Sequence, residues 1–136
     1  MRVHLAVAGL AVALIGPAFA AGTIGVELNT LTQAEAACRI TFVAQNTLTV
    51  DISELGLEVA LFDKEGVFDR SIVLKTGSLP IGKSRVRQFD LPTLSCKSVG
   101  RILVNDVTEC TGTGLTAASC LRVLNVTTRA SVPLEL

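Results

Sequence analysis

The sequence contains no tryptophan or tyrosine, and its single histidine, His4, lies among the first twenty of its 136 residues. Residues 21–136 therefore cannot form a Ser-His-Asp or Cys-His catalytic arrangement. They also lack the commonest ligand for zinc and copper, and the rings that stack best on sugars and bases. These absences argue against histidine-dependent catalysis, a histidine metal centre and recognition by aromatic stacking.

Neither sign of charge is in excess. Removing Arg2 with the first twenty residues leaves 11 of the 12 Lys and Arg against 12 Asp and Glu, a formal charge of −1 for residues 21–136. A neutral balance removes the electrostatic attraction by which proteins bind the phosphate backbone. We therefore expect no nucleic-acid partner, and the sequence indicates no cofactor and no metal site.

The only long apolar run is at the N-terminus. It extends from Leu5 to Ile15, ends at Gly16-Pro17 and is followed by the A-x-A pattern Ala18-Phe19-Ala20, which is typical of a secretory signal peptide. The run is shorter than the roughly 20 apolar residues that span a bilayer. We predict a signal peptide over 1–20, one domain over 21–136, a periplasmic or secreted location, and no stable membrane insertion after cleavage.

Alternation of apolar and polar residues recurs along the rest of the chain and predicts β-strands. An edge strand is expected at 22–28, and Thr32 with Glu35 weakly favours one helical turn after it. Further strands are predicted at 38–45, 55–63, 67–75, 84–91, 101–108 and 121–128. About seven short strands without a long helix predict an all-β, antiparallel β-sandwich of the immunoglobulin or fibronectin type.

One hydrophobic core is expected between the sheets of this sandwich. Its predicted members are Ile40, Phe42, Leu57, Val59, Leu61, Ile72, Phe89, Leu91, Ile102, Val104 and Val123.

Four cysteines in an exported chain predict two disulfides, for which three pairings exist. Cys96 and Cys110 flank one predicted strand, whose extended length would hold them up to roughly 45 Å apart, whereas bonded cysteines need Cα atoms about 5–6 Å apart. Cys110 and Cys120 bracket a loop rich in Gly and Thr that closes easily. We therefore predict the pairs Cys38–Cys96 and Cys110–Cys120.

A row of cations is the candidate interaction surface. Lys83, Arg85 and Arg87 share one side of a predicted strand that continues to Phe89 and Leu91. A regular strand would put the arginines beside this apolar pair, so a β-bulge near Arg87 is expected to re-aim them. The cations could meet an acidic ligand or partner; the alternative is a solvated edge whose charges discourage strand pairing.

Several short patterns together resemble one family. They are Asn29, Leu31, Cys38-Arg, Asn46, Leu61-Phe-Asp-x-x-Gly66, Phe89-Asp-x-x-x-Leu-x-Cys96, Gly100-Arg-x-Leu-Val-Asn-Asp-Val-x-x-Cys110 and Cys120. This set is similar to a family of exported alphaproteobacterial proteins that are commonly labelled Tat-pathway signal proteins of unknown function. The resemblance covers most of 21–136 and implies a periplasmic or secreted location without implying an activity. The chain departs from the label because it has no twin-arginine pair.

Two classes of function follow from these observations. The first is a non-catalytic exported β-sandwich that binds a protein or acts in an envelope assembly. The second is a carrier of a small molecule or an ion, or, with less support, a hydrolase that uses only carboxylates, such as Asp90 with Asp106 or Glu109.

The exported protein is expected to begin at Ala21, because the small residues Ala18 and Ala20 fit the specificity of signal peptidase. Intact-mass analysis should show loss of residues 1–20 and of four hydrogens relative to the reduced chain. Two free thiols in fresh, unreduced material would contradict the predicted disulfides.

Overall fold

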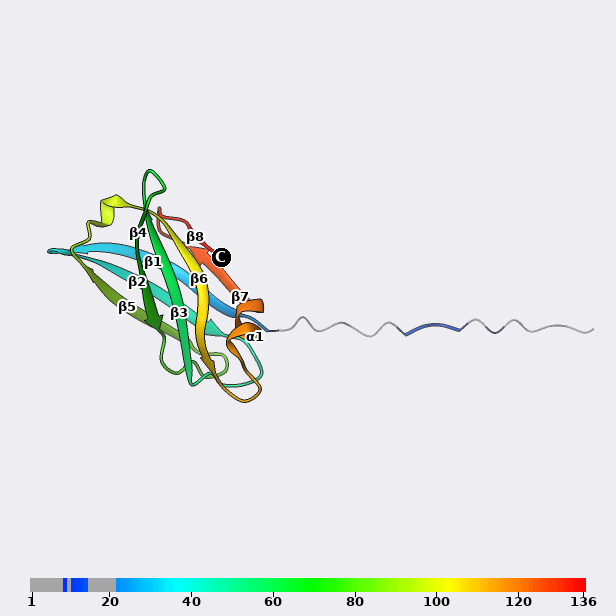
Figure 1. Ribbon diagram of the computed structural model, residues 1–136. Helices are drawn as coiled ribbons and strands as arrows, with labels where there is room; N and C mark the ends of the chain where they lie inside the picture. The colour runs from blue at the N-terminus through cyan, green and yellow to red at the C-terminus, as the bar shows by residue number, and fades with distance from the viewer. Residues whose placement is uncertain (1–8, 10, 15–21) are drawn as a thin grey trace, which may run out of the picture.

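Two four-stranded β-sheets face one another in the computed structural model, which describes residues 9, 11–14 and 22–136 (Figure 1). The predicted signal peptide, 1–20, lies outside the described residues except for residues 9 and 11–14. The strands are β1 (Ile24–Ala34), β2 (Ala37–Asn46), β3 (Glu54–Asp63), β4 (Phe68–Lys75), β5 (Ser84–Pro92), β6 (Val99–Thr111), β7 (Leu124–Thr128) and β8 (Leu134–Glu135). Two short helices interrupt them, η1 (Cys96–Ser98) and α1 (Ala117–Arg122).

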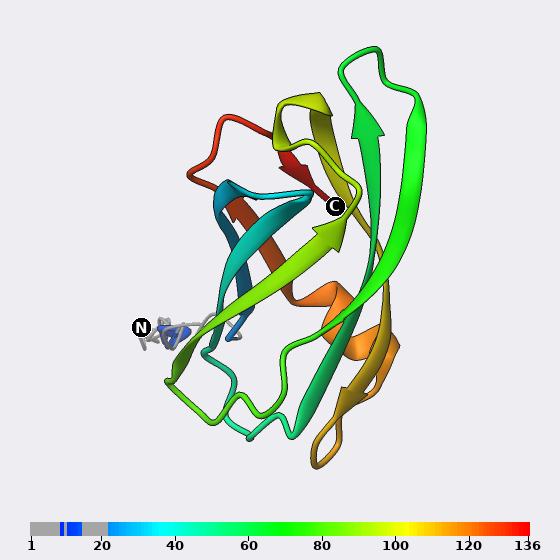
Figure 2. The same cartoon turned by 90° about the vertical axis from the view of Figure 1, so that its left-hand side faces the viewer.

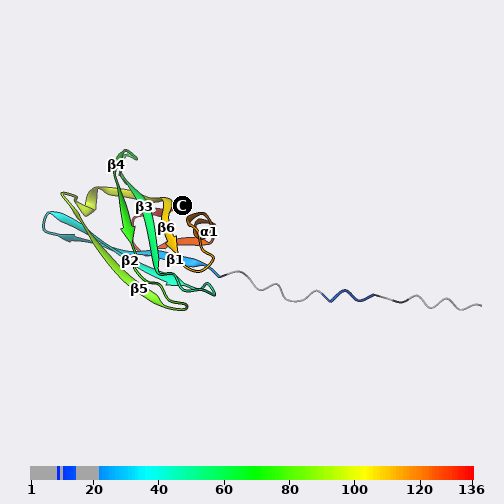
Figure 3. The ribbon, with the colours of Figure 1, turned by 60° about the horizontal axis from the view of Figure 1, so that its bottom comes forward.

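The strand order is β5-β2-β1-β7 in the first sheet and β4-β3-β6-β8 in the second. Pairing is antiparallel except for β1 with β7 and β6 with β8, which are parallel. The two layers are separated clearly when the molecule is viewed as in Figure 3. The predicted all-β sandwich is confirmed, with the two-residue strand β8 added to the expected seven.

The first strand differs from its prediction in two ways. It lies between β2 and β7, so it is not an edge strand. It also continues to Ala34 without a helical turn, so the interpretation of Thr32 and Glu35 as a capping box was wrong. The side-chain amide of Gln33 instead donates to the carbonyl oxygens of Glu35 and Ala37 and closes a hairpin.

The predicted strand 121–128 begins two residues inside a helix. Thr116 and Ser119 form a reciprocal capping box, in which the Thr116 hydroxyl accepts from the Ser119 N–H and the Ser119 hydroxyl accepts from the Thr116 N–H. The helix continues to Arg122, and only from Leu124 does the chain become the strand β7. The strand is therefore confirmed over 124–128 and wrong at Leu121 and Arg122, because apolar alternation does not separate a short helix from a short strand.

The predicted bulge near Arg87 is also absent. The register of β5 on β2 is unbroken, with Phe42 opposite Arg87 and Thr41 opposite Gln88. A register shift occurs instead in β1, where Asn29 lies between paired residues and has no partner of its own on β2.

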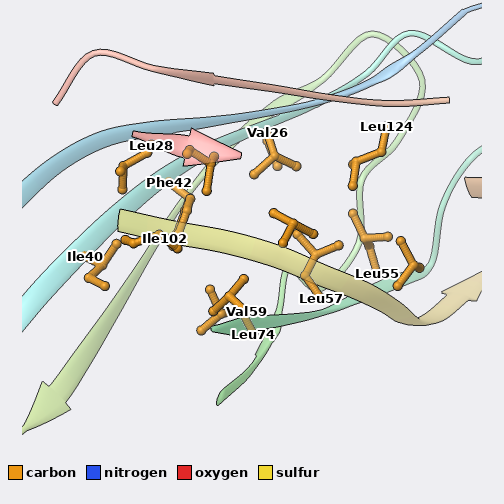
Figure 4. Close-up of a cluster of buried hydrophobic side chains, with 14 of the residues drawn as sticks. Val26, Leu28, Ile40, Phe42, Leu55, Leu57, Val59, Leu74, Ile102 and Leu124 are labelled. Atoms are coloured by element: carbon orange, nitrogen blue, oxygen red, sulfur yellow. The ribbon is translucent and has the colours of Figure 1, made fainter. Parts of the chain in front are cut away.

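The core lies between the two sheets and contains most of the predicted residues. Of these, Ile72, Phe89 and Val123 are only half-buried, and the others are buried. Figure 4 shows Val26, Leu28, Ile40, Phe42 and Leu124 of the first sheet facing Leu55, Leu57, Val59, Leu74 and Ile102 of the second. Ile52 and Leu79 are fully buried but were not predicted, because they pair across an isolated bridge between two connections.

Both predicted disulfides are formed. Cys38 of β2 is bonded to Cys96 of η1 with a Cα–Cα distance of 5.0 Å, and Cys110 of β6 is bonded to Cys120 of α1 at 6.4 Å. Two such bonds indicate an oxidising compartment outside the cytoplasm. Among the described residues, no helix has the length and apolar character needed to cross a bilayer.

Replacing Phe42 with alanine should lower the free energy of unfolding by about 3–5 kcal/mol, because large buried side chains leave cavities. Phe42 is 4% exposed, and its ring packs edge-on against that of Phe89 at 6.2 Å between centroids. The control Val86→Ala, at a position 59% exposed, should change the free energy by less than about 0.5 kcal/mol. Urea denaturation measures both; a Phe42→Ala loss below about 1 kcal/mol would contradict the burial.

Candidate functional site

The three cations predicted as an interaction surface do not form one free row. Lys83 lies in the turn before β5, whereas Arg85 and Arg87 are half-buried and face inward beside Phe89. Arg87 donates from Nε to the carbonyl oxygen of Thr76 and from Nη1 to that of Val86, at 3.0 Å. Arg87 therefore holds the β4–β5 connection in place. The inward-facing arginines need no bulge, because β5 is an edge strand and their charged ends can reach solvent at the edge of the sheet.

The carboxylates considered for hydrolysis lie on different sheets. Asp90, on β5, forms a bidentate ion pair with Arg39, at 2.7 and 2.9 Å, and this pair lowers the pKa of Asp90 below its ordinary value. On β6, Glu109 pairs with Lys75 at 3.2 Å and Asp106 accepts from the Val107 N–H. These residues therefore do not converge on one cleft.

No metal cluster is present in the part of the chain that the structure describes, where no three His, Cys, Asp or Glu side chains come together. The turn after β3, which contains the carboxylates of Asp63 and Glu65, has a structural role. One side-chain oxygen of Asp63 accepts from the N–H groups of Glu65 and Val67, and Gly66 takes a positive φ of 81°. This turn is tight and internally bonded.

A cleft of about 440 Å³ lies at the end of the sandwich where three connections meet. They are the β3–β4 turn, the η1 segment and the β7–β8 loop, which gather at one end of the molecule in Figure 2. Each contributes one cation, Lys64, Lys97 and Arg129 respectively. We call this the cationic cleft.

Lys64 reaches the cleft because of a glycine on a neighbouring strand. Gly100 is the second residue of β6, at a register shift against β3, and a side chain there would place its Cβ 2.3 Å from the carbonyl oxygen of Asp63 and 2.8 Å from the Cα of Lys64. Only glycine lets the β3–β4 turn lie so close to β6.

Lys97 and Arg129 are also held by specific bonds. Lys97 follows Cys96, which is fixed to β2 by its disulfide and whose N–H donates to the side chain of Gln33 at 2.8 Å. Arg129 donates from its backbone N–H to the carbonyl of Leu28 at 2.8 Å and from Nε to Glu27 at 3.0 Å.

The cleft is electropositive because its lining includes no acidic side chain. Glu27 lies beside it and receives hydrogen bonds from Asn29 and Arg129, which hold its pKa below the ordinary value. Glu27 is thus ionised and offsets part of the charge of Arg129. Within the described residues, Lys64 and Lys97 form no ion pair.

A second feature is an apolar surface on the β3–β4 hairpin, which projects beyond the rest of the sandwich in Figures 1 and 2. Val67 is 60% exposed and Phe68 is 55% exposed. The rings of Phe62 and Phe68 pack edge-on at 6.0 Å, and the guanidinium carbon of Arg101 lies 4.2 Å from the centre of the Phe62 ring. We call these four residues the hairpin patch.

Sequence reasoning missed both features for different reasons. The three cations of the cleft come from distant connections, so no local motif unites them. The hairpin patch had a readable signal, because Val67 and Phe68 directly follow the turn at Gly66, but alternation alone assigned them to a strand.

Comparison with known proteins adds a structural likeness. No protein-family model matches the chain, and no curated protein matches it. The solved structure of IrmA from Escherichia coli is similar, with a TM-score of 0.59 and 12% sequence identity over 77% of this chain and 91% of IrmA. A likeness at this identity shows a shared fold alone.

Proposed function

We propose that this protein is a non-catalytic exported β-sandwich that binds another protein, such as a component of an envelope assembly, in the periplasm or outside the cell. The observation that carries the proposal is the hairpin patch, where Val67 and Phe68 are more than half exposed on a projecting hairpin. Exposed apolar clusters rimmed by polar residues are typical of protein interfaces.

The composition of the patch suits an interface. Aromatic residues and arginine are enriched where binding energy concentrates, and a few such residues account for most of an interface's affinity. Phe62, Phe68 and Arg101 supply these types, whereas Lys64 and Glu65 at the turn supply a polar rim. The domain has no Trp or Tyr, so Phe68 is its most exposed aromatic ring in the described residues.

The patch is also ordered before any partner binds. Asp63 donates its N–H to the Val67 carbonyl at 2.9 Å, and its side chain accepts the Val67 N–H in return. The guanidinium of Arg101 lies over the Phe62 ring, and its Nη1 forms an ion pair with a carboxylate oxygen of Glu135 at 3.4 Å. Side chains that are already fixed lose less conformational entropy on binding.

Two further observations support a site of action outside the cytoplasm. The two disulfides indicate an oxidising compartment, and the N-terminal sequence has the pattern of a signal peptide. Both are consistent with either a periplasmic or a secreted protein.

A carrier of a small molecule or an ion is the second candidate, and the cationic cleft favours it. Carboxylate-based hydrolysis gains no support, because Asp90 lies on a different sheet from Asp106 and Glu109.

The double substitution V67S/F68S should weaken binding of a protein partner at least about 10-fold, because truncation of an interface anchor commonly costs more than about 1 kcal/mol. The matched control is I81S/V86S, which removes two side chains that are 52% and 59% exposed elsewhere. The partner is first isolated by affinity capture from envelope extract, and the purified partner is then titrated with each variant.

Equal affinities of V67S/F68S and the native protein would contradict the assignment of the patch. Failure to capture any stoichiometric protein would contradict the proposed function as a whole.

A further inference from the structure

We propose that the cationic cleft binds a small organic anion that has two or more negatively charged oxygens and an apolar body. This inference goes beyond the proposed protein binding, since it concerns a different class of ligand and, apart from Lys64 at the rim of the hairpin patch, different side chains.

The charge of the cleft supports an anion with more than one negative oxygen. Lys64, Lys97 and Arg129 come from three separate connections, and no acidic side chain joins them in the lining. Three cations that line one cleft repel one another. An anion bound between them would attract all three and lower this repulsion. Glu27 already offsets part of the charge of Arg129, and a ligand with two negative oxygens balances more of the remaining charge than a singly charged ligand does.

The cations also have free donor groups. Arg129 uses its Nε for Glu27, and among the described residues its two terminal nitrogens make no hydrogen bond. Those nitrogens can bind a carboxylate or phosphate with two parallel bonds. The hydroxyl of Ser131 in the same loop adds a further donor at the lining.

The interior of the cleft supports an apolar body on the ligand. Leu31 and Cys96 are half-buried and line the cleft, whereas Val99 and Val132 in the same lining are almost fully buried, at 3% and 7% exposed. An apolar group against Leu31 and Cys96 would remove their exposed apolar surface from water and strengthen the neighbouring charge interactions by excluding solvent.

The size of the cleft agrees with an organic ligand rather than a bare ion. Its volume of about 440 Å³ falls within the roughly 300–1,000 Å³ common for small-molecule sites. An inorganic ion would fill only a small part of this volume and would leave the rest to water.

The backbone positions that bear the three cations are fixed before a ligand binds, which lowers the entropic cost of binding. Lys64 is placed by the close approach at Gly100, Lys97 by the disulfide of Cys96, and Arg129 by its bonds to Leu28 and Glu27. A bulge at Asn29 borders the same space, and bulges recur beside functional sites.

The test is calorimetric titration of the purified disulfide-bonded protein at pH 7.5 and low salt with phenyl phosphate, inorganic phosphate and phenol. Phenyl phosphate combines two negative oxygens with an apolar ring, and the other two probes each lack one of these parts. We expect saturable binding of phenyl phosphate, at least about 10-fold weaker binding of inorganic phosphate, and no measurable binding of phenol. Affinity for phenyl phosphate should fall as salt rises.

The variant K64Q/K97Q should bind phenyl phosphate at least about 10-fold more weakly than the native chain. The charge-matched control K83Q/R85Q removes two cations outside the cleft and should bind as the native chain does. Thermal unfolding of both variants, each unchanged within about 3 °C, would show that lost binding is not lost structure.

Three results would overturn the proposal. They are no saturable binding of phenyl phosphate, inorganic phosphate binding as tightly as phenyl phosphate, and K83Q/R85Q losing as much affinity as K64Q/K97Q. The last result would assign the attraction to the overall charge of the protein. None of them bears on V67S/F68S, so failure here is distinguishable from failure of the proposed protein binding.

Discussion

The fold depends on how the chain is fixed where it crosses from one sheet to the other. It crosses five times, between β2 and β3, β4 and β5, β5 and β6, β6 and β7, and β7 and β8. The Cys38–Cys96 bond attaches the β5–β6 crossing to β2, and the Cys110–Cys120 bond attaches the β6–β7 crossing to β6. Covalent bonds thus fix the two crossings that contain short helices.

Polar side chains that bond to backbone carbonyls fix the other crossings. Asn46 is fully buried and donates from Nδ2 to the carbonyls of Val50 and Leu79, at 2.9 Å each, which joins the β2–β3 and β4–β5 crossings. The Thr128 hydroxyl donates to the carbonyl of Val132 at 2.9 Å and shapes the β7–β8 loop. Because the fixed β5–β6 and β7–β8 crossings also bear cations of the cleft, the bonds that hold the fold together also pre-form the candidate binding site.

The sequence could predict those features that depend on the alternation of residues along a strand or on the distance that an extended segment spans. Alternation placed Ile40 and Phe42 on the buried side of β2, and the length of the strand between Cys96 and Cys110 ruled out their pairing. The parallel contact of β1 with β7 was not predictable, because it joins segments from opposite ends of the domain. The cationic cleft was hidden for the same reason, since its three cations become neighbours only after the chain has crossed between sheets.

The role of the disulfides is tested most directly by equilibrium unfolding of C38S/C96S and C110S/C120S in urea. The bonds close segments with sequence separations of 58 and 10 residues, and the chain-entropy model gives losses of about 4 and about 3 kcal/mol respectively. We expect both variants to be destabilised, with C38S/C96S the more affected. A loss below about 1 kcal/mol in C38S/C96S would contradict the claim that this bond fixes the crossing between the sheets.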